Sequence, residues 1–379
     1  MEYPKFKVCV RCMTYNQSKY IEETMNGFTM QQTDFPFVCC IVDDASTDGE
    51  KDVIIKYLQK HFDISNSSVS CSEETDYAYI YFAQHKKNKN CFFAVLLLKE
   101  NLYSKKEEYK KFSYIARWRD TCDYEAICEG DDYWIDCEKI QSQASFLDKN
   151  SNYSMVASNS YLISEDGRKL GIYFSKLPSR NILTMEELIE GRKFHTASVM
   201  LRLELWKKSR VTKLNNTWDT FLWCSLLEFK PIYYSKKITC VYRRGNQGVV
   251  QGTNKFDWLM ITSEWSNILI EQFTPKYISH EIIAKIKTND LLTGILQNFR
   301  SFSYRQRQIL WNEYRNSFYW CNLTSNIKSI IKIILILILR SIMPTKLKNV
   351  VKPKIRRIKK MSSLPKFWLQ NTKMVRNTL

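Results

Sequence analysis

Strand-like and helix-like patterns alternate over the first 150 residues of this 379-residue chain, and this limits its fold more than any other feature. Strand patterns at 7–12 and 37–42 are each followed by a segment whose apolar residues repeat at helical spacing. Further strands are expected at 78–83 and 125–128. Such alternation is typical of a mostly parallel sheet with helices on both faces. The sequence therefore predicts an α/β fold with a Rossmann-like sheet.

Polar segments follow three of the predicted strands. They occupy residues 13–16, 43–46 and 129–132. Ligands of such sheets bind beyond the carboxyl ends of the strands, so we expect the three segments to line one cleft.

The third segment contains three carboxylates within four positions: Glu129, Asp131 and Asp132. Neighbouring carboxylates repel one another unless a cation lies close. Their oxygens are natural ligands of Mg²⁺ or Mn²⁺, which commonly bridge to substrate phosphates. The segment therefore predicts a metal–diphosphate site. A solvated acidic turn that caps the next helix is the open alternative.

The net charge of +18 is concentrated at the C-terminal end, where 15 Lys and Arg follow the last acidic residue, Glu313. Residues 330–339 are strongly apolar but too few to span a membrane. Lys328, Lys332 and Arg340 would lie on one side of a helix, which suits the membrane interface, and the basic residues beyond would attract anionic lipid. A core helix with a solvated tail is the alternative. No nucleic-acid partner is expected, because no reading motif accompanies the charges.

Cysteine usage indicates a reducing compartment. The twelve cysteines show no zinc-like pairing, and Cys9 and Cys12 lie in a strand pattern that suggests buried thiols. No signal peptide precedes the first strand. The expected location is the cytoplasm.

Three motifs occur in a characteristic order: Met13-Thr14-Tyr15-Asn16-Gln17, then Val42 to Gly49, then Glu129 to Trp134. Together they resemble the family 2 glycosyltransferases with the GT-A fold, of the bacterial surface-polysaccharide type, over roughly residues 5–250. The resemblance implies a catalytic domain at 1–250. The residue patterns beyond it predict a helical extension at 251–323 and a basic membrane-associating tail at 324–379.

The resemblance also implies roles for individual residues in donor binding. Asp131 would be the metal ligand, supported by Asp132, and Glu129 stands where the family usually has Asp. The residues implied to bind the donor are Thr14, Tyr15 and Asn16 (base and ribose), Asp44 (uracil) with Ser46, Arg117 (with Arg119 as alternative), Glu129, Gly130, Asp132 and Ser198. Arg243 or Arg244, which follow a predicted strand, could bind the diphosphate, with a solvated surface charge as the alternative.

Catalysis of sugar transfer requires a base that takes the proton of the acceptor hydroxyl. In the resemblance this base is Asp219, which would equally suit a helix N-cap. His195 lies in the stretch that lines the donor sugar and acceptor mouth, with a purely structural role as the alternative. Trp134 could pack under the sugar or in the core.

The expected function is inverting transfer of one sugar from a nucleotide-sugar donor, by family habit a UDP-sugar, with Mn²⁺ or Mg²⁺ as cofactor. The acceptor would be a hydroxyl of a glycan or lipid-linked glycan at the inner face of the cytoplasmic membrane. The family's processive synthases carry a QxxRW motif and transmembrane helices, which this sequence lacks. Nucleotidyl transfer and a non-catalytic nucleotide-sugar-binding or membrane-scaffold role are the competing hypotheses.

Overall fold

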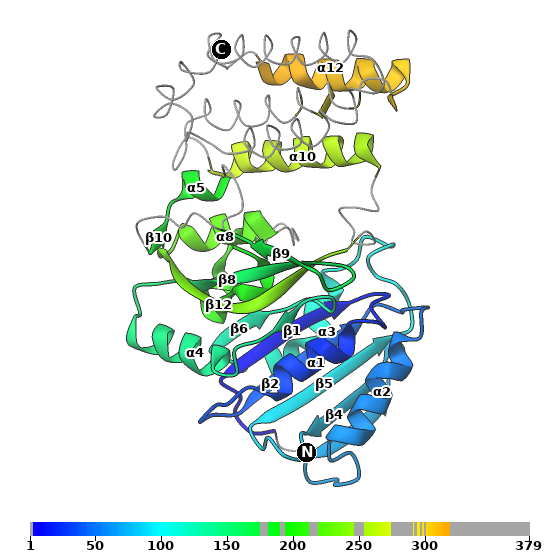
Figure 1. The fold of residues 1–379 in the computed structure, drawn as a ribbon, viewed down its shortest axis with the longest axis vertical. Coiled ribbons are helices and arrows are strands. Elements are labelled where there is room, and N and C mark those ends of the chain that lie inside the picture. The colour runs from blue at the N-terminus through cyan, green and yellow to red at the C-terminus, as the bar shows by residue number, and fades with distance from the viewer. Residues whose placement is uncertain are drawn as a thin grey trace. The chain divides into compact units, whose positions relative to one another are not determined.

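The computed structural model describes residues 3–174, 181–189, 194–211, 219–245, 254–273 and 301–318, with 291, 294, 295 and 298. The chain divides into two compact units, Met1–Gln251 and Gly252–Leu379. Figure 1 shows the sheet and helices of the first unit. The predicted tail at 324–379 lies outside the described residues, so the three-part domain division stays a prediction.

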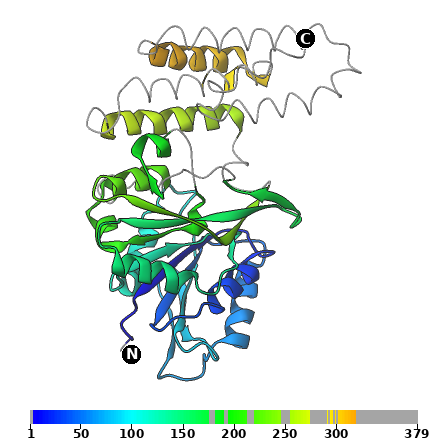
Figure 2. The same cartoon turned by 60° about the vertical axis from the view of Figure 1, so that its left-hand side comes forward.

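The first unit is built on one large mixed sheet (Figures 1 and 2). Its order is β10-β12-β8-β11-β6-β1-β2-β5-β4-β3, with β7 paired to β12 and β9 paired to β8. The strands are β1 (Val8–Thr14), β2 (Phe37–Asp43), β3 (Ser70–Glu74), β4 (Ala78–Gln84), β5 (Cys91–Leu98), β6 (Tyr124–Ile127), β7 (Tyr133–Trp134), β8 (Met155–Ser164), β9 (Lys169–Ile172), β10 (Ile182–Leu183), β11 (Met200–Arg202) and β12 (Ile232–Arg244).

The centre of the sheet is parallel. Strands β6, β1, β2 and β5 run side by side in the same direction, while β4 is antiparallel to β5 and β11 is antiparallel to β6. Beyond β11, the long strands β8 and β12 pair in parallel, as the turned view in Figure 2 shows. The predicted α/β fold with a mostly parallel core is confirmed.

Strand β5 is absent from the strands predicted from the sequence, although it pairs with β2 over seven positions from Phe37↔Cys91 to Asp43↔Leu97. All of its residues are buried. A strand covered on both faces reads as an unbroken apolar run without alternation, and such runs fit a buried helix equally well.

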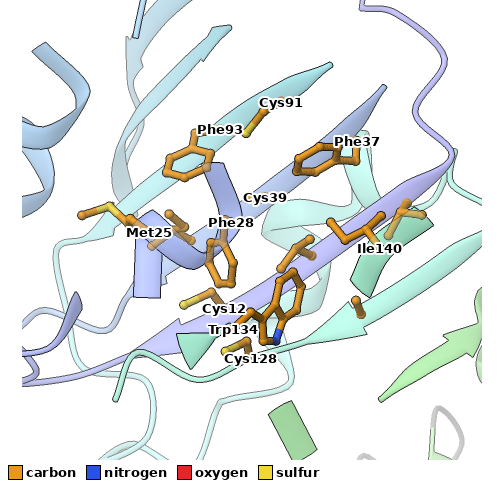
Figure 3. Close-up of a cluster of buried hydrophobic side chains, with 14 of the residues drawn as sticks. Cys12, Met25, Phe28, Phe37, Cys39, Cys91, Phe93, Cys128, Trp134 and Ile140 are labelled. Atoms are coloured by element: carbon orange, nitrogen blue, oxygen red, sulfur yellow. The ribbon is translucent and has the colours of Figure 1, made fainter. Parts of the chain in front are cut away.

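Helices cover both faces of the sheet. Helices α1 (Ile21–Thr29), α2 (Glu50–His61) and α4 (Lys139–Lys149) share one apolar core on one face, and α3 (Lys110–Arg119) contacts β1 and β2 through a different set of side chains. In Figure 3 the shared core centres on Phe28 and Trp134, whose rings lie 4.9 Å apart edge to face. Buried thiols such as Cys12 and Cys128 fill this core, and every cysteine that the structure describes is free.

The other helices described in the first unit are short. They are α5 (Met185–Ile189), the 3₁₀ turn η1 (Thr196–Ser198), α6 (Leu203–Lys208) and α8 (Asp219–Leu227). Trp134 donates from Nε1 to the carbonyl of Ala197 in η1 at 2.8 Å and is almost fully buried. Of its two predicted roles, the structure therefore supports core packing.

The second unit contains α10 (Lys255–Phe273) and α12 (Tyr304–Phe318). Leu259, Ile295, Phe302 and Leu310 belong to a small apolar core of their own. Among the described residues, no helix has the length and apolar character needed to cross a membrane.

Candidate active site

Glu50 fastens together the two loops that follow β1 and β2. It begins α2, and its buried carboxylate accepts hydrogen bonds from the hydroxyl of Thr14, from the amide of Gln17 at 2.8 Å and from Oγ of Ser46 at 2.9 Å. Burial raises the pKa of Glu50 to about 7, although these hydrogen bonds oppose the shift. Glu50 is not among the site residues predicted from the sequence. The one feature of the sequence that could have indicated its role is its position as an acidic residue in the first turn of the helix after the second motif.

The predicted nucleotide-binding loop has a fixed backbone. Asn16 adopts the left-handed conformation with φ 55°, which Asn tolerates better than most residues. Its amide donates to Oγ of Ser46 at 2.8 Å, and its side-chain oxygen accepts from the amide of Thr47 at 2.8 Å. Tyr15 is 45% exposed, whereas Thr14 is buried. Of these predicted residues, Tyr15 therefore has the most free surface for a planar base.

Asp44 is buried, and both of its carboxylate oxygens have protein partners. They accept from the amide of Leu102 at 2.9 Å and from that of Tyr103 at 3.1 Å, and Nζ of Lys111 lies 2.8 Å away. Asp44 thus anchors the segment that leads into α3. The uracil contact implied for Asp44 stays a prediction, and it would have to use lone pairs that these three partners leave free.

Arg117 is not brought into the cluster of candidate residues. Its guanidinium pairs with Glu73 on the outer strand β3 at 2.5 Å and lies over the ring of Trp118. The alternative, Arg119, is buried in an ion pair with Glu125. The basic residue of α3 that does face the candidate site is Lys111, through Asp44.

The acidic segment after β6 does place carboxylates together. Burial raises the pKa of Glu129 to about 7, Arg11 opposes the shift, and the charges of Asp219 and Asp131 add to it. Burial likewise raises the pKa of Asp131. The carboxylate of Glu129 therefore interacts electrostatically with two others. One is Asp131 of the same segment, and the other is Asp219, the first residue of α8. The roles predicted for these carboxylates stay predictions.

Asp132 points into the protein. Its Oδ1 accepts from the amide of Arg243 at 3.0 Å, its Oδ2 lies 3.3 Å from Nδ1 of His195, and its carbonyl accepts from the hydroxyl of Thr24 at 2.7 Å. Because the side chain is buried, direct donor contact by Asp132 does not fit this geometry. Asp132 instead fixes the backbone of the acidic segment against β12.

Ser198 and His195 also have structural partners. Ser198 is fully buried, and its hydroxyl donates to the carbonyl of His195 at 2.7 Å, which closes the η1 turn. The predicted donor contact of Ser198 therefore does not fit its position. His195 stacks on Tyr242 with ring centroids 3.9 Å apart. This packing supports the structural role left open for His195.

Asp219 is the first residue of α8. Its Oδ2 accepts from the hydroxyl of Thr196 at 2.8 Å. Thr196 thereby orients the carboxylate, and the influence of Asp219 on Glu129 and on Arg11 places it beside the acidic segment. Its sequence neighbours at 212–218 lie outside the described residues.

Arg243 holds the acidic segment from β12. It forms an ion pair with Glu23, its Nε donates to the carbonyl of Asp131 at 3.2 Å, and its guanidinium lies 4.3 Å from the ring centre of Tyr20. It is therefore adjacent to the predicted metal ligand. Arg244 is exposed, and residues 246–253 lie outside the described part of the chain.

Whether Glu129 and Asp131 can bind a metal ion depends on the chemistry of their side chains. The described residues contain no group of three or more His, Cys, Asp or Glu placed to hold a metal ion. Mg²⁺, however, is commonly held by one or two carboxylates together with substrate phosphates. Burial raises the pKa of Glu129 and of Asp131, so a bound cation would stabilise their charged forms. These two residues therefore fit a divalent cation that arrives with a diphosphate.

Gly130 makes the close packing of the acidic segment possible. A Cβ at this position would lie 2.0 Å from Oγ1 and 2.5 Å from Cβ of Thr14. We expect Gly130→Ala to displace Thr14 from Glu50, to destabilise the fold by about 1–3 kcal/mol, as overpacking does, and to weaken nucleotide binding at least tenfold. Urea denaturation and calorimetry measure the two effects.

The matched control is Gly171→Ala, where an added Cβ meets no atom within 4 Å but φ is +141°. It should destabilise through its backbone alone and leave nucleotide binding unchanged. Wild-type nucleotide affinity in Gly130→Ala would show that the Thr14–Gly130 contact is unimportant for the site.

Comparison with known proteins adds evidence on the family and the fold. Residues 9–68 match the family described as "Glycosyl transferase family 2". Uncharacterized proteins of Mycobacterium tuberculosis and Mycobacterium bovis are 29% identical over 190 residues, which is 50% of this chain and 45% of each relative. The chain thus spans about half the length of the curated relatives it matches.

Two solved structures of S. aureus TarS residues 1–349 share the fold. The complex with UDP-GlcNAc has a TM-score of 0.53 and 16% identity, covering 83% of this chain and 80% of that chain. The complex with UDP has a TM-score of 0.52 and 16% identity, covering 83% and 81%.

Proposed function

We propose that the chain is a family 2 glycosyltransferase with the GT-A fold, and that it moves a single sugar from a UDP-sugar to a hydroxyl of a glycan or lipid-linked acceptor, with inversion. The observation that supports this most is the mutual electrostatic influence of Glu129, Asp131 and Asp219, in a segment whose Gly130 amide donates to the carbonyl of Met13 in β1 at 3.2 Å. A transferase that separates a sugar from a diphosphate needs both a cation site and a base.

Donor binding is assigned to the loops that Glu50 fastens. Tyr15 offers an exposed ring, and Asn16 and Ser46 form the rim of the same loops. TarS, which has this fold, binds UDP-GlcNAc and UDP. This likeness supports a UDP-sugar as the donor class. The identity of the sugar is to be determined by a screen of nucleotide sugars.

The leaving diphosphate is assigned to the acidic segment. Asp131 and Glu129 would hold Mn²⁺ or Mg²⁺, which when bound stabilises the charge that develops on a leaving diphosphate. Arg243 lies beside Asp131 and can turn from Glu23 to donate two parallel hydrogen bonds to a phosphate. Cation and guanidinium thus act on the same group.

Asp219 is proposed as the base. Thr196 orients its carboxylate through Oδ2, and this carboxylate would accept the proton of the acceptor hydroxyl as that oxygen bonds to the anomeric carbon. The bond from that carbon to the diphosphate breaks in the same step, through an oxocarbenium-like state. Attack from the face opposite the leaving group gives inversion.

Residues 324–379 are proposed to hold the enzyme at the inner face of the cytoplasmic membrane, where lipid-linked acceptors are accessible. Deletion of this segment is expected to move the protein from the membrane fraction to the supernatant, because the basic residues and the apolar run are removed together. Sedimentation with vesicles that contain anionic lipid measures the change. Unchanged partitioning would refute the membrane role.

Two measurements test the reaction class. A thermal-shift screen of nucleotide sugars with Mn²⁺ should single out UDP-sugars, since only ligands of the native state raise its stability. Product analysis with the donor so identified should then detect a nucleoside diphosphate. Release of pyrophosphate would instead indicate nucleotidyl transfer, and binding without any turnover would favour the non-catalytic role.

A further inference from the structure

A hollow separate from the acidic segment opens along α1 and the C-terminal end of α2. Its volume is about 650 Å³, which lies in the range of small-molecule sites. Glu23, Gly27 and Met30 line it from α1, and Tyr133 and Ile135 line it beyond the acidic segment. None of the residues proposed for the nucleotide or the base lines this hollow.

Basic side chains enter the hollow from two segments. Lys60 and His61 come from the end of α2, and His85, Lys86 and Lys87 come from the turn between β4 and β5. The segments are held in register, because Nζ of Lys86 donates to the carbonyls of Gln59 and Lys60 at 3.0 Å each. The rings of His61 and His85 lie parallel with centroids 6.2 Å apart.

Within the part of the chain that the structure describes, the lysines of this wall have no ion-pair partners. Some exposed lysines elsewhere in the unit do form ion pairs, such as Lys99 with Glu74 at 2.7 Å. Throughout the described residues, no ion pair involves Lys60, Lys86 or Lys87. The one carboxylate among the lining residues is Glu23, which is paired with Arg243. The wall therefore carries uncompensated positive charge.

His85 supplies a hydrogen-bond donor in this wall. It is 7% exposed, and its Nδ1 accepts from the amide of Asn88 at 2.8 Å. In the neutral imidazole the proton must then reside on Nε2, which can donate to a ligand. Burial lowers the pKa of His85 to about 4, and His61, Lys87, Lys89 and Lys86 lower it further. The carboxylate of Glu22 opposes this positive charge, because it acts to raise the pKa of His61.

We propose that this hollow is a second binding site, specific for a phosphate ester. Lys60 and Lys87 supply charge, Nε2 of His85 supplies a neutral donor, and the exposed apolar side chains of Met30 and Ile135 cover the organic part of the ester. A soluble sugar or polyol phosphate and a phospholipid headgroup share this chemistry. The site does not depend on the proposed transfer reaction.

The test uses the full-length protein and two probes, glycerol 3-phosphate and vesicles of phosphatidylglycerol, with phosphatidylcholine vesicles as reference. The double variant Lys60→Glu/Lys87→Glu removes two cations from the hollow. The control Lys56→Glu/Lys149→Glu makes the same charge change at exposed lysines that do not line it. Loss of two charge-assisted contacts should weaken binding by about tenfold or more.

Wild-type protein and the control are expected to bind at least one probe with equal affinity, and the double variant is expected to bind it at least tenfold more weakly. The C-terminal tail is the same in all three proteins, so only a difference between the double variant and the control reports on the hollow. Weaker binding of glycerol 3-phosphate by the double variant indicates a soluble ester, and weaker binding confined to phosphatidylglycerol vesicles indicates a lipid headgroup. Failure of the wild type to bind either probe, or equal binding of both probes by the double variant and the control, would overturn the proposal. UDP binding should be the same in all three proteins, so a failure of the donor site is recognised separately.

Discussion

Replacement of Asp219 by Asn is expected to lower kcat by about a thousandfold or more, since general-base catalysis typically contributes 10²–10⁴-fold. Asn has nearly the same shape, and its side-chain oxygen can still accept the hydrogen bond that Thr196 donates at 2.8 Å in the wild type. It cannot take up the proton of the acceptor hydroxyl. The Kd of the donor should therefore change by less than about twofold, because uniform binding is untouched.

The measurements are the rate of nucleoside diphosphate release and the donor Kd by calorimetry. Thr196→Val is the matched comparison, since it removes the hydroxyl that orients Asp219 but keeps the carboxylate. Its kcat should fall less than that of Asp219→Asn. Wild-type turnover by Asp219→Asn would exclude Asp219 as the base and would require another carboxylate, with Glu129 the next to test.

Replacement of Glu125 by Gln is expected to destabilise the fold by about 3–5 kcal/mol, the range for breaking a buried ion pair. Glu125 is fully buried in β6, between Nε of Arg11 at 2.5 Å and Nε of Arg119 at 2.6 Å. The Arg119 guanidinium also lies 3.7 Å from the ring centre of Trp206. Gln fills the same space but removes the buried counterion that the two guanidinium groups share, and among the described residues Arg119 retains only Asp120, at 3.3 Å.

The destabilisation caused by Glu125→Gln should become smaller as the pH falls. Burial works to raise the pKa of Glu125, but Arg119 and Arg11 outweigh it, so the folded-state pKa is lowered. The stabilisation by Glu125 is therefore present above its unfolded-state pKa and is lost as the pH falls through the folded-state value. The difference in unfolding free energy between wild type and Glu125→Gln should shrink toward acid pH.

Urea denaturation measures both effects through the midpoint at constant slope. Glu74→Gln, which breaks the exposed ion pair with Lys99, should leave the midpoint nearly unchanged. A wild-type midpoint for Glu125→Gln at neutral pH would show that the buried ion pairs do not contribute to stability.

The positions of the candidate site could largely be predicted from the sequence. Polar residues directly after β1, β2 and β6 had to meet, because the carboxyl ends of adjacent parallel strands lie at one edge of a sheet. The convergence of Glu129 with Asp131 and Asp219 follows from that rule together with the family resemblance. The directions in which individual side chains point were harder to predict from the sequence. Asp132 and Ser198, for example, were predicted to contact the donor but are buried.

The residues that hold the site together could not be predicted, because their partners are remote in sequence. Glu50 lies 36 residues along the chain from Thr14, whose hydroxyl donates to it. On α3, the family resemblance pointed to Arg117 or Arg119, but the helix face on which each basic residue lies determines its partners. Lys111 lies on the buried side, while Arg117 lies on a side that faces β3. Glu125 is a charged residue within an apolar strand, and the sequence does not indicate that Arg11 and Arg119 are its partners.

The central claim is that the acidic segment binds a diphosphate through a divalent cation. Calorimetric titration of UDP into wild type and Asp131→Asn, each with and without Mn²⁺, tests it most directly. Wild type should bind UDP at least tenfold more tightly with Mn²⁺, and Asp131→Asn should show no such gain, because a lost carboxylate ligand removes much of the cation's affinity. Equal affinity of both proteins for UDP, with and without Mn²⁺, would contradict the claim.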